Sequence, residues 1–190
     1  MKFSAAILAG GKSSRMGRDK AFLEIGGQTL LAHQIELVQA AGATEIFISG
    51  RADTDYSNFG LPVLQDEFPD IGPLGGIHAA LGAAQYPLVL ILAVDLPAMT
   101  SRFLNSLTMA SASECGVIPQ VGGRVEPLAA IYPRAASDIV SRMLKDGNLT
   151  VRQFGDACVK AGLTVYNDVP AELGHLFKNM NVPADVPRLV

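Results

Sequence analysis

The stretch that decides the fold is Phe3–Lys20, FSAAILAGGKSSRMGRDK. It begins with an apolar run, residues 3–8, whose length and sharp end are typical of a strand buried on both faces. Gly10 and Gly11 then interrupt the run, because glycine adopts backbone angles that other residues resist. Four cations and a single acid follow: Lys12, Arg15, Arg18, Lys20 and Asp19. Backbone N–H groups and cations in such a loop bind anions, so the stretch predicts a phosphate site directly after a buried strand.

Two common phosphate-binding motifs do not fit this stretch. A Walker A loop has glycine five residues before the glycine that precedes its lysine, and Ala6 occupies that position ahead of Gly11. The dinucleotide-binding fingerprint needs glycine at its first, third and sixth positions, and Gly10, Gly11 and Gly17 do not have that spacing. Taken alone, the stretch also leaves open a plain surface turn rich in glycine and lysine.

Residues 8–20, LAGGKSSRMGRDK, resemble the signature L-A-G-G-x-S-x-R-M-G-x-x-K of the molybdenum cofactor guanylyltransferases, a family of nucleotidyltransferases. The spacing fits without a gap. The resemblance implies that Arg15 and Lys20 are catalytic residues acting on phosphates. It also implies that backbone groups surround the nucleotide at Leu8, Ala9, Gly10 and Gly11. Cytidylyl-transferring relatives usually carry alanine in place of Gly10, so the glycine favours guanine.

Farther along the chain, predicted strands alternate with predicted helices. Thr29 is a candidate cap for a helix reaching about residue 41, and EIFIS at residues 45–49 is typical of a second strand. A strand, a helix and a strand at this spacing predict a parallel βαβ unit. The run LVLILAV at residues 88–94 predicts a central strand, because burial on both faces requires nearly continuous apolar residues. Ser101 is a candidate cap for the helix that follows.

Asp95 comes directly after the predicted central strand. Open α/β sheets bind ligands beyond the carboxyl ends of their strands, and Mg²⁺ prefers oxygen ligands. Residues 94–97, VDLP, resemble the family's x-D-x-P, in which the aspartate holds the metal. The resemblance therefore implies that Asp95 is a catalytic residue that binds Mg²⁺ and the nucleotide. Without it, an ordinary turn aspartate at a strand end stays open.

Three further positions are assigned to the nucleotide by the resemblance. GPLGGI at residues 72–77, which contains Gly75, resembles the family segment G-P-L-x-G-[IML] at the start of a predicted helix. Asp66 matches the aspartate that precedes this segment, and in the family both lie beside the purine. A carboxylate can accept hydrogen bonds from guanine N1–H and N2–H together, although without the resemblance an ordinary turn or cap aspartate is the simpler interpretation of Asp66. Ser49 stands where the family often has asparagine near the nucleotide.

The second half of the chain carries motifs that the family directs toward the pterin substrate. RVEPLAAIY at residues 124–132 resembles R-x-E-P-L-x-A-x-Y, which makes Arg124 a candidate for a phosphate or pterin carbonyl and Glu126 for pterin N–H groups. A surface ion pair across a hairpin remains open for both. FKNMNVP at residues 177–183 resembles the closing F-x-N-x-N-T-P, with valine for threonine. Asn181 is then a candidate metal or phosphate ligand, and Asn179 is expected to orient the loop.

Composition limits the remaining choices. At 190 residues, 49% of them hydrophobic, the chain is expected to form a single nucleotidyltransferase domain over residues 1–190. A net charge of −3 does not suggest a nucleic-acid-binding surface. Cys115 and Cys158 belong to no metal-binding motif and are expected to be reduced. No signal segment or membrane-length apolar run is present, so we expect a cytoplasmic protein.

The expected fold is an α/β three-layer sandwich: a mainly parallel Rossmann-like sheet with helices on both faces and a small antiparallel part. The resemblance implies transfer of GMP from GTP to molybdopterin, the molybdenum cofactor, with Mg²⁺ and release of pyrophosphate. It also implies passing contacts with proteins that supply and receive the cofactor. Three alternatives stay open: a cytidylyltransferase for the same cofactor, another nucleotidyltransferase, and a non-catalytic nucleotide-binding cofactor chaperone.

Overall fold

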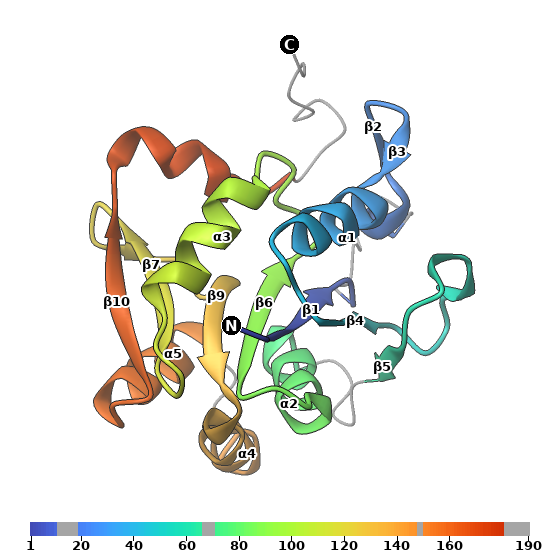
Figure 1. Ribbon diagram of the computed structural model, residues 1–190. Helices are drawn as coiled ribbons and strands as arrows, with labels where there is room; N and C mark the ends of the chain where they lie inside the picture. The colour runs from blue at the N-terminus through green and yellow to red at the C-terminus, as the bar shows by residue number, and fades with distance from the viewer. Residues whose placement is uncertain (11–18, 66–70, 148–149, 181–190) are drawn as a thin grey trace.

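The computed structural model describes residues 1–10, 19–65, 71–147 and 150–180. Its centre is an eight-stranded sheet with the strand order β10-β7-β9-β6-β1-β4-β5, to which β8 is added by pairing with β7 (Figure 1). The strands are β1 Ser4–Leu8, β4 Glu45–Gly50, β5 Val63–Gln65, β6 Leu88–Ala93, β7 Gly116–Val121, β8 Arg124–Val125, β9 Ala129–Pro133 and β10 Thr164–Val169. A separate small hairpin pairs β2 Glu24–Ile25 with β3 Gln28–Thr29.

The sheet is mainly parallel, with one reversed strand near its middle. β5, β4, β1 and β6 run in the same direction, and β9 is antiparallel to both β6 and β7. Since β7 is reversed again relative to β9, it runs with β6, and β10 pairs with it in parallel. The carboxyl ends of β1, β4, β6 and β7 therefore meet at a common edge of the sheet, where α/β proteins bind ligands.

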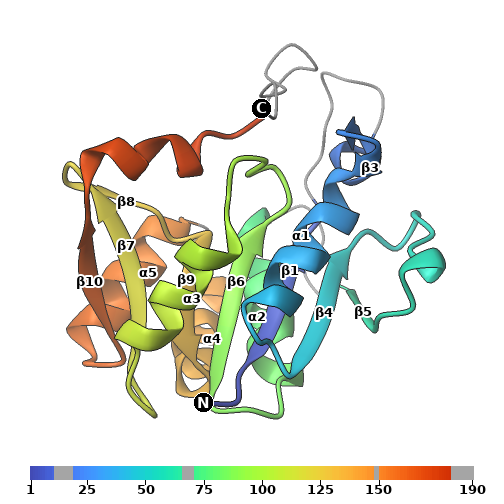
Figure 2. The same cartoon turned by 45° about the horizontal axis from the view of Figure 1, so that its top comes forward.

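Helices cover both faces of the sheet, as Figure 2 shows. Helices α1 (Leu30–Ala40) and α3 (Ser101–Ala110) lie on one face. The other face carries α2 (Pro73–Ala83), α4 (Ser137–Lys145) and α5 (Val151–Lys160). Together with the mainly parallel sheet, this confirms the expected three-layer α/β architecture with a small antiparallel part.

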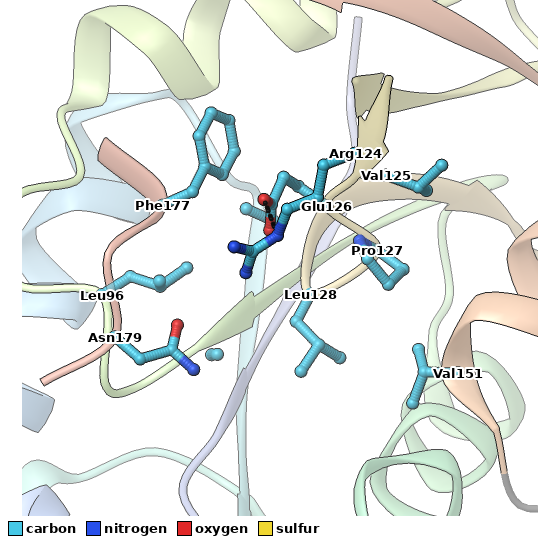
Figure 3. A pocket seen from close by; sticks show the side chains of 11 residues that line it. Leu96, Arg124, Val125, Glu126, Pro127, Leu128, Val151, Phe177 and Asn179 are labelled. Atoms are coloured by element: carbon cyan, nitrogen blue, oxygen red, sulfur yellow. Dashed lines mark ion pairs between the residues drawn. The ribbon is translucent and has the colours of Figure 1, made fainter. Parts of the chain in front are cut away.

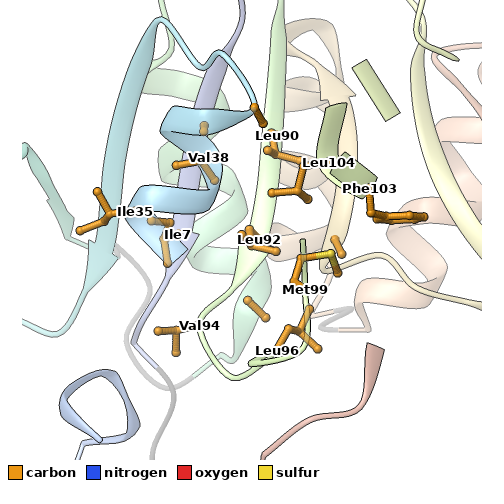
Figure 4. Close-up of a cluster of buried hydrophobic side chains, with 14 of the residues drawn as sticks. Ile7, Ile35, Val38, Leu90, Leu92, Val94, Leu96, Met99, Phe103 and Leu104 are labelled. Carbon is orange, nitrogen blue, oxygen red and sulfur yellow. The ribbon is translucent and has the colours of Figure 1, made fainter. Parts of the chain in front are cut away.

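Alternation along the strands produces the two hydrophobic layers, because successive side chains of a strand point to opposite faces. Ile7, Leu90 and Leu92 pack with residues of α1 and α3, including Ile35 and Leu104 (Figure 4). Their neighbours along the same strands pack under α2 and α4: Ala6, Val89 and Ile91. Every residue of β6 is buried, which explains the continuous apolar run seen in the sequence.

Capping side chains set two helix starts. Thr29 caps α1 as expected, and its hydroxyl accepts from the Ala32 N–H. The prediction that Ser101 caps α3 was wrong by one residue. Thr100 has the extended backbone of a cap, and its hydroxyl accepts from the Phe103 N–H, so Ser101 is already the first helical residue.

Where the structure describes the connections, they contain four short 3₁₀ helices: η1 Lys20–Phe22, η2 Ser57–Phe59, η3 Arg134–Ala136 and η4 Ala171–Phe177. None of the helices in the described part of the chain combines the length and the apolar character that crossing a membrane requires.

Candidate active site

The carboxyl ends of β1, β4 and β6, at Leu8, Gly50 and Ala93, form the floor of the candidate site. Hydrogen bonding between the strands continues past β1: the Ala9 N–H donates to the Ser49 carbonyl at 2.8 Å, and the Val94 N–H donates to the Leu8 carbonyl at 3.2 Å. This places Gly10 between the ends of β4 and β6. Gly10, the last described residue before residue 19, is therefore central at this edge of the sheet.

Lys20 and Asp95 meet at this edge, although 75 residues separate them in the chain. The Lys20 Nζ atom lies 3.3 Å from Asp95 Oδ2. Both side chains are about one-fifth exposed, so the pair is shielded by the protein but open to a ligand from the edge. Lys20 comes from η1, after the glycine loop, and Asp95 follows the end of β6.

A cavity of about 200 Å³ opens next to this pair. Figure 3 shows Arg124 and Glu126 at its centre, with Phe177 and Asn179 on one side and Leu128 and Val151 on the other. Three of the four residues that the sequence assigned to the pterin side therefore line one cavity. They arrive from two parts of the chain, β8 with the segment after it and the segment after η4.

An ion pair joins the two charged residues of the cavity, with 3.0 Å between Arg124 Nε and Glu126 Oε1. Arg124 is largely exposed, while the Glu126 side chain is mostly covered. Burial raises the pKa of Glu126 above its ordinary value, and the Arg124 guanidinium opposes that rise. The ion pair that the sequence left open is thus present, between two residues that also line the cavity.

The backbone connects this cavity to the Lys20–Asp95 pair at two points. Ala93 lines the cavity, and Asp95 follows two residues later. Asn179 also lines it, and the N–H of the next residue, Met180, donates to the Asp95 carbonyl at 2.8 Å. The cation–carboxylate pair and the cavity are consequently adjacent parts of one site.

The start of α2 closes the other side of the site. Gly75 and Gly76 are buried there, and a Cβ atom placed on Gly76 would lie 2.5 Å from Ser49 Oγ and 3.1 Å from Leu8 Cδ2. Only glycine allows this approach, which brings Gly75 next to the strand ends. It also covers Ser49, whose side chain is 5% exposed, while its carbonyl bonds to Ala9.

Four of the candidate site residues lie outside the described residues: Gly11, Arg15, Asp66 and Asn181. In contrast, the structure adds apolar residues that sequence reasoning missed, among them Leu128, Val151 and Phe177 in the cavity wall. Phe177 and Leu128 belong to the two pterin-side motifs, and membership of these motifs could have indicated that they line the site. Val151 belongs to no motif and carried no such signal.

The donors at this edge fit a magnesium ion shared with a nucleotide. Within the ranges that the structure describes, no group of three or more His, Cys, Asp or Glu side chains is placed to hold a metal ion. Asp95 offers a single partly exposed carboxylate. Mg²⁺ is commonly held by one or two carboxylates together with substrate phosphates and water, so the residues present suit Mg²⁺ arriving with a triphosphate.

Comparison with known proteins decides the family. Residues 5–160 match the model of the MobA-like NTP transferase domain. The chain belongs to this family. Its MobA-like domain spans β1 to the end of α5 and so includes Lys20, Asp95, Arg124 and Glu126. The resemblance drawn from the LAGG signature is confirmed.

Two curated relatives of this MobA-like chain carry the same description. A protein of Opitutus terrae named "Probable molybdenum cofactor guanylyltransferase" is 36% identical over 97% of this chain and 93% of its own length. A protein of Clostridium perfringens with that name is 34% identical over 90% of this chain and 84% of its own.

A solved structure shares the fold of this MobA-like chain. It is titled molybdopterin-guanine dinucleotide biosynthesis protein A, from Archaeoglobus fulgidus. The TM-score is 0.73 at 23% identity, covering 96% of this chain and 94% of that one.

Proposed function

We infer that this chain transfers GMP from GTP to molybdopterin, the molybdenum cofactor, forming the molybdopterin guanine dinucleotide cofactor and releasing pyrophosphate. The family membership and the names of the relatives at 34–36% identity support this activity. The observation that carries it is the adjacency of two subsites. One holds the Lys20–Asp95 pair at the strand ends, and the other is the cavity of Arg124, Glu126 and Asn179.

This adjacency suits a transfer between two phosphate-bearing substrates. The glycine edge and Lys20 would receive the triphosphate, while the cavity beside them would receive the pterin. Glu126 can accept hydrogen bonds from ring N–H groups, and Arg124 can donate to a carbonyl or phosphate. The Met180 N–H, directly after Asn179, donates to the Asp95 carbonyl. A displacement of the backbone in one subsite would therefore shift the backbone of the other.

The reaction needs charge stabilisation more than a strong base. An oxygen of the acceptor's terminal phosphate, already ionised at neutral pH, bonds to the α-phosphorus of GTP. The bond from that phosphorus to the bridging oxygen breaks, and pyrophosphate leaves with the electron pair. Repulsion between the two polyanions is the main obstacle, and fixed cations reduce it. Lys20 supplies one such cation, and Arg15, outside the described residues, is proposed as another.

Asp95 is the residue we propose to hold Mg²⁺. When bound, the ion would neutralise phosphate charge and orient the triphosphate. The role of Lys20 beside Asp95 is then to contact the phosphates and to hold the carboxylate in place. Asp66, also outside the described residues, is proposed to accept hydrogen bonds from guanine.

The test is a transfer assay with GTP labelled at the α-phosphate, Mg²⁺ and molybdopterin, run beside CTP and ATP. We expect the label in the dinucleotide with GTP and pyrophosphate release in equal amount. Asp95→Ala should reduce the rate roughly 100- to 1000-fold, the usual effect of removing one preorganised electrostatic group. Asp168→Ala, on the edge strand β10, is the matched control and should leave the rate unchanged.

Each alternative has its own outcome in this assay. Transfer from CTP in preference to GTP would identify the cytidylyl relative. Binding of GTP with no release of pyrophosphate would contradict catalysis and favour a cofactor chaperone. An Asp95→Ala variant with the wild-type rate would show that Asp95 has no role in catalysis.

A further inference from the structure

Tyr56 occupies a place that neither the family motifs nor the site description includes. It lies in the connection between β4 and β5, which extends past the edge of the sheet in Figure 1, yet its side chain is 2% exposed. Its ring fills the space left by the missing side chain of Gly50, where a Cβ atom would lie 2.4 Å from Tyr56 Cε2. Phe22 stacks on the ring with 5.7 Å between centroids.

The hydroxyl of this buried ring joins two segments that are far apart in the chain. It accepts from the Arg51 N–H at 3.4 Å, at the end of β4, and donates to Asp19 Oδ2 at 3.3 Å. Burial raises the pKa of Tyr56, so the hydroxyl keeps its proton near neutral pH and can act as the donor. The strand end is thereby linked to the Asp19 carboxylate.

Asp19 in turn fixes the backbone turn that contains Lys20. Its other oxygen, Oδ1, accepts from the Ala21 N–H at 3.0 Å, and Asp19 is the cap of the 3₁₀ turn η1 whose first residue is Lys20. The carboxylate therefore holds the turn from one side while Tyr56 holds the carboxylate from the other. From this turn, the Lys20 side chain extends toward Asp95, with 3.3 Å between Nζ and Oδ2.

Gly50, on which the Tyr56 ring packs, also lies against Gly10 just after the end of β1. A Cβ atom on Gly10 would lie 3.8 Å from the Gly50 carbonyl carbon, so Gly50 touches the glycine edge on one face and the Tyr56 ring on the other. Residues 11–18 are thus flanked by Gly10, which lies against Gly50, and by Asp19, which is hydrogen-bonded to Tyr56.

We propose that Tyr56, acting through Asp19, is a positioning residue that sets the direction in which Lys20 presents its ammonium group to the phosphates of the triphosphate. Lysine is a point charge on a flexible four-carbon stem, so its effect on a transition state depends on where its backbone is anchored. A fixed anchor places the ammonium before the substrate arrives, which is the condition for electrostatic stabilisation. This proposal rests on the proposed function in giving Lys20 a phosphate partner.

The test is a double-mutant cycle between Tyr56→Phe and Lys20→Ala. Tyr56→Phe keeps the ring against Gly50 and removes the hydroxyl. We expect kcat to fall roughly tenfold, as for loss of a hydrogen bond to a charged group, with less than a twofold change in KM for molybdopterin. In the Lys20→Ala background, the same substitution should have no further effect on kcat, because Tyr56 acts through Lys20.

Two matched variants separate positioning from stability. Tyr166→Phe removes another tyrosine–carboxylate hydrogen bond, to Asp156, on β10 at the far end of the sheet, and should leave kcat unchanged. Asp19→Asn keeps an oxygen for the Ala21 N–H while removing the carboxylate charge. It should lower kcat in the same way as Tyr56→Phe, so it replaces that variant if the latter does not fold.

Calorimetry with inorganic tripolyphosphate and Mg²⁺ gives a second readout that needs neither guanine nor pterin. Tyr56→Phe should weaken binding in the wild-type background and not in Lys20→Ala. Equal effects of Tyr56→Phe in both backgrounds would overturn the proposal, as would a wild type that does not bind tripolyphosphate. A wild type that binds tripolyphosphate but transfers no GMP would overturn the proposed function alone, and the cycle would still be measured on binding.

Discussion

At the edge of the sheet, the constraint that selects the residue type differs from one position to the next, and Gly10 is an example. Gly10 lies outside the left-handed region of the backbone, and its nearest contacts with the described residues would be ordinary for a Cβ atom, at 3.8 Å or more from Ser49 and Gly50. The fold itself would therefore accept alanine at this position. Among the described residues, the packing does not require glycine here, and we propose that the nucleotide lies against it.

We expect Gly10→Ala to leave the fold intact and to change nucleotide binding. The free energy of unfolding should change by less than about 1 kcal/mol, because alanine fits the backbone at this position. Affinity for GTP should fall relative to CTP, since alanine is the residue that the cytidylyl-transferring relatives usually carry. Calorimetry with both nucleotides, alongside urea unfolding, measures the two effects separately. An unchanged ratio of GTP to CTP affinity would exclude Gly10 from base selection.

At the scale of one element, helix α2 shows how closely a helix can approach the strand ends. Its Gly76 lies over Ser49 and Leu8, and a side chain there would overlap with both. Its Gly82 has nothing within 4 Å of a would-be Cβ atom and is exposed. Although both glycines lie in α2, the packing leaves no room for a side chain at Gly76 and ample room for one at Gly82.

Substitution of these two glycines by alanine should therefore have opposite signs. Gly76→Ala is expected to destabilise the protein by about 1–3 kcal/mol, the usual result of overpacking a buried contact. Gly82→Ala should stabilise it by roughly 0.5–1 kcal/mol, because alanine loses less backbone entropy in a helix. Urea unfolding of both variants measures this. A neutral Gly76→Ala would mean that α2 can move away from the strand ends at little cost.

Across the whole molecule, the layers bury groups that could otherwise react. Cys158 on α5 is fully buried between the helix and the sheet, and burial raises the pKa of its thiol to about 12. Cys115, just before β7, is partly exposed. Since the thiolate is the reactive form, the intact fold suppresses the chemistry of Cys158 by both exclusion and protonation.

Alkylation of Cys158 should consequently report unfolding of the whole molecule. Iodoacetamide at pH 8 is expected to modify Cys115 in the native protein and Cys158 only as urea populates the unfolded state. Mass spectrometry of the two peptides over a urea series measures this, and Cys115→Ser isolates the second reaction. Equal rates for both cysteines without urea would show that α5 opens independently of the sheet.

The sequence by itself determined the elements and the family of this protein. Continuous apolar runs identified β1 and β6, and a threonine cap identified the start of α1, because these signals depend on neighbours within one or two turns. The LAGG signature indicated the family, and the family match confirms that assignment. These are local properties, so a single chain displays them directly.

Only the tertiary structure decided which distant residues meet. Lys20 reaches Asp95 across 75 residues, and the cavity combines side chains from β8, the start of α5 and the segment after η4. The link from Tyr56 through Asp19 to Lys20 depends on the ring lying over Gly50, which no motif records. Such contacts follow from the full strand order and the layer packing, which local sequence patterns indicate only in outline.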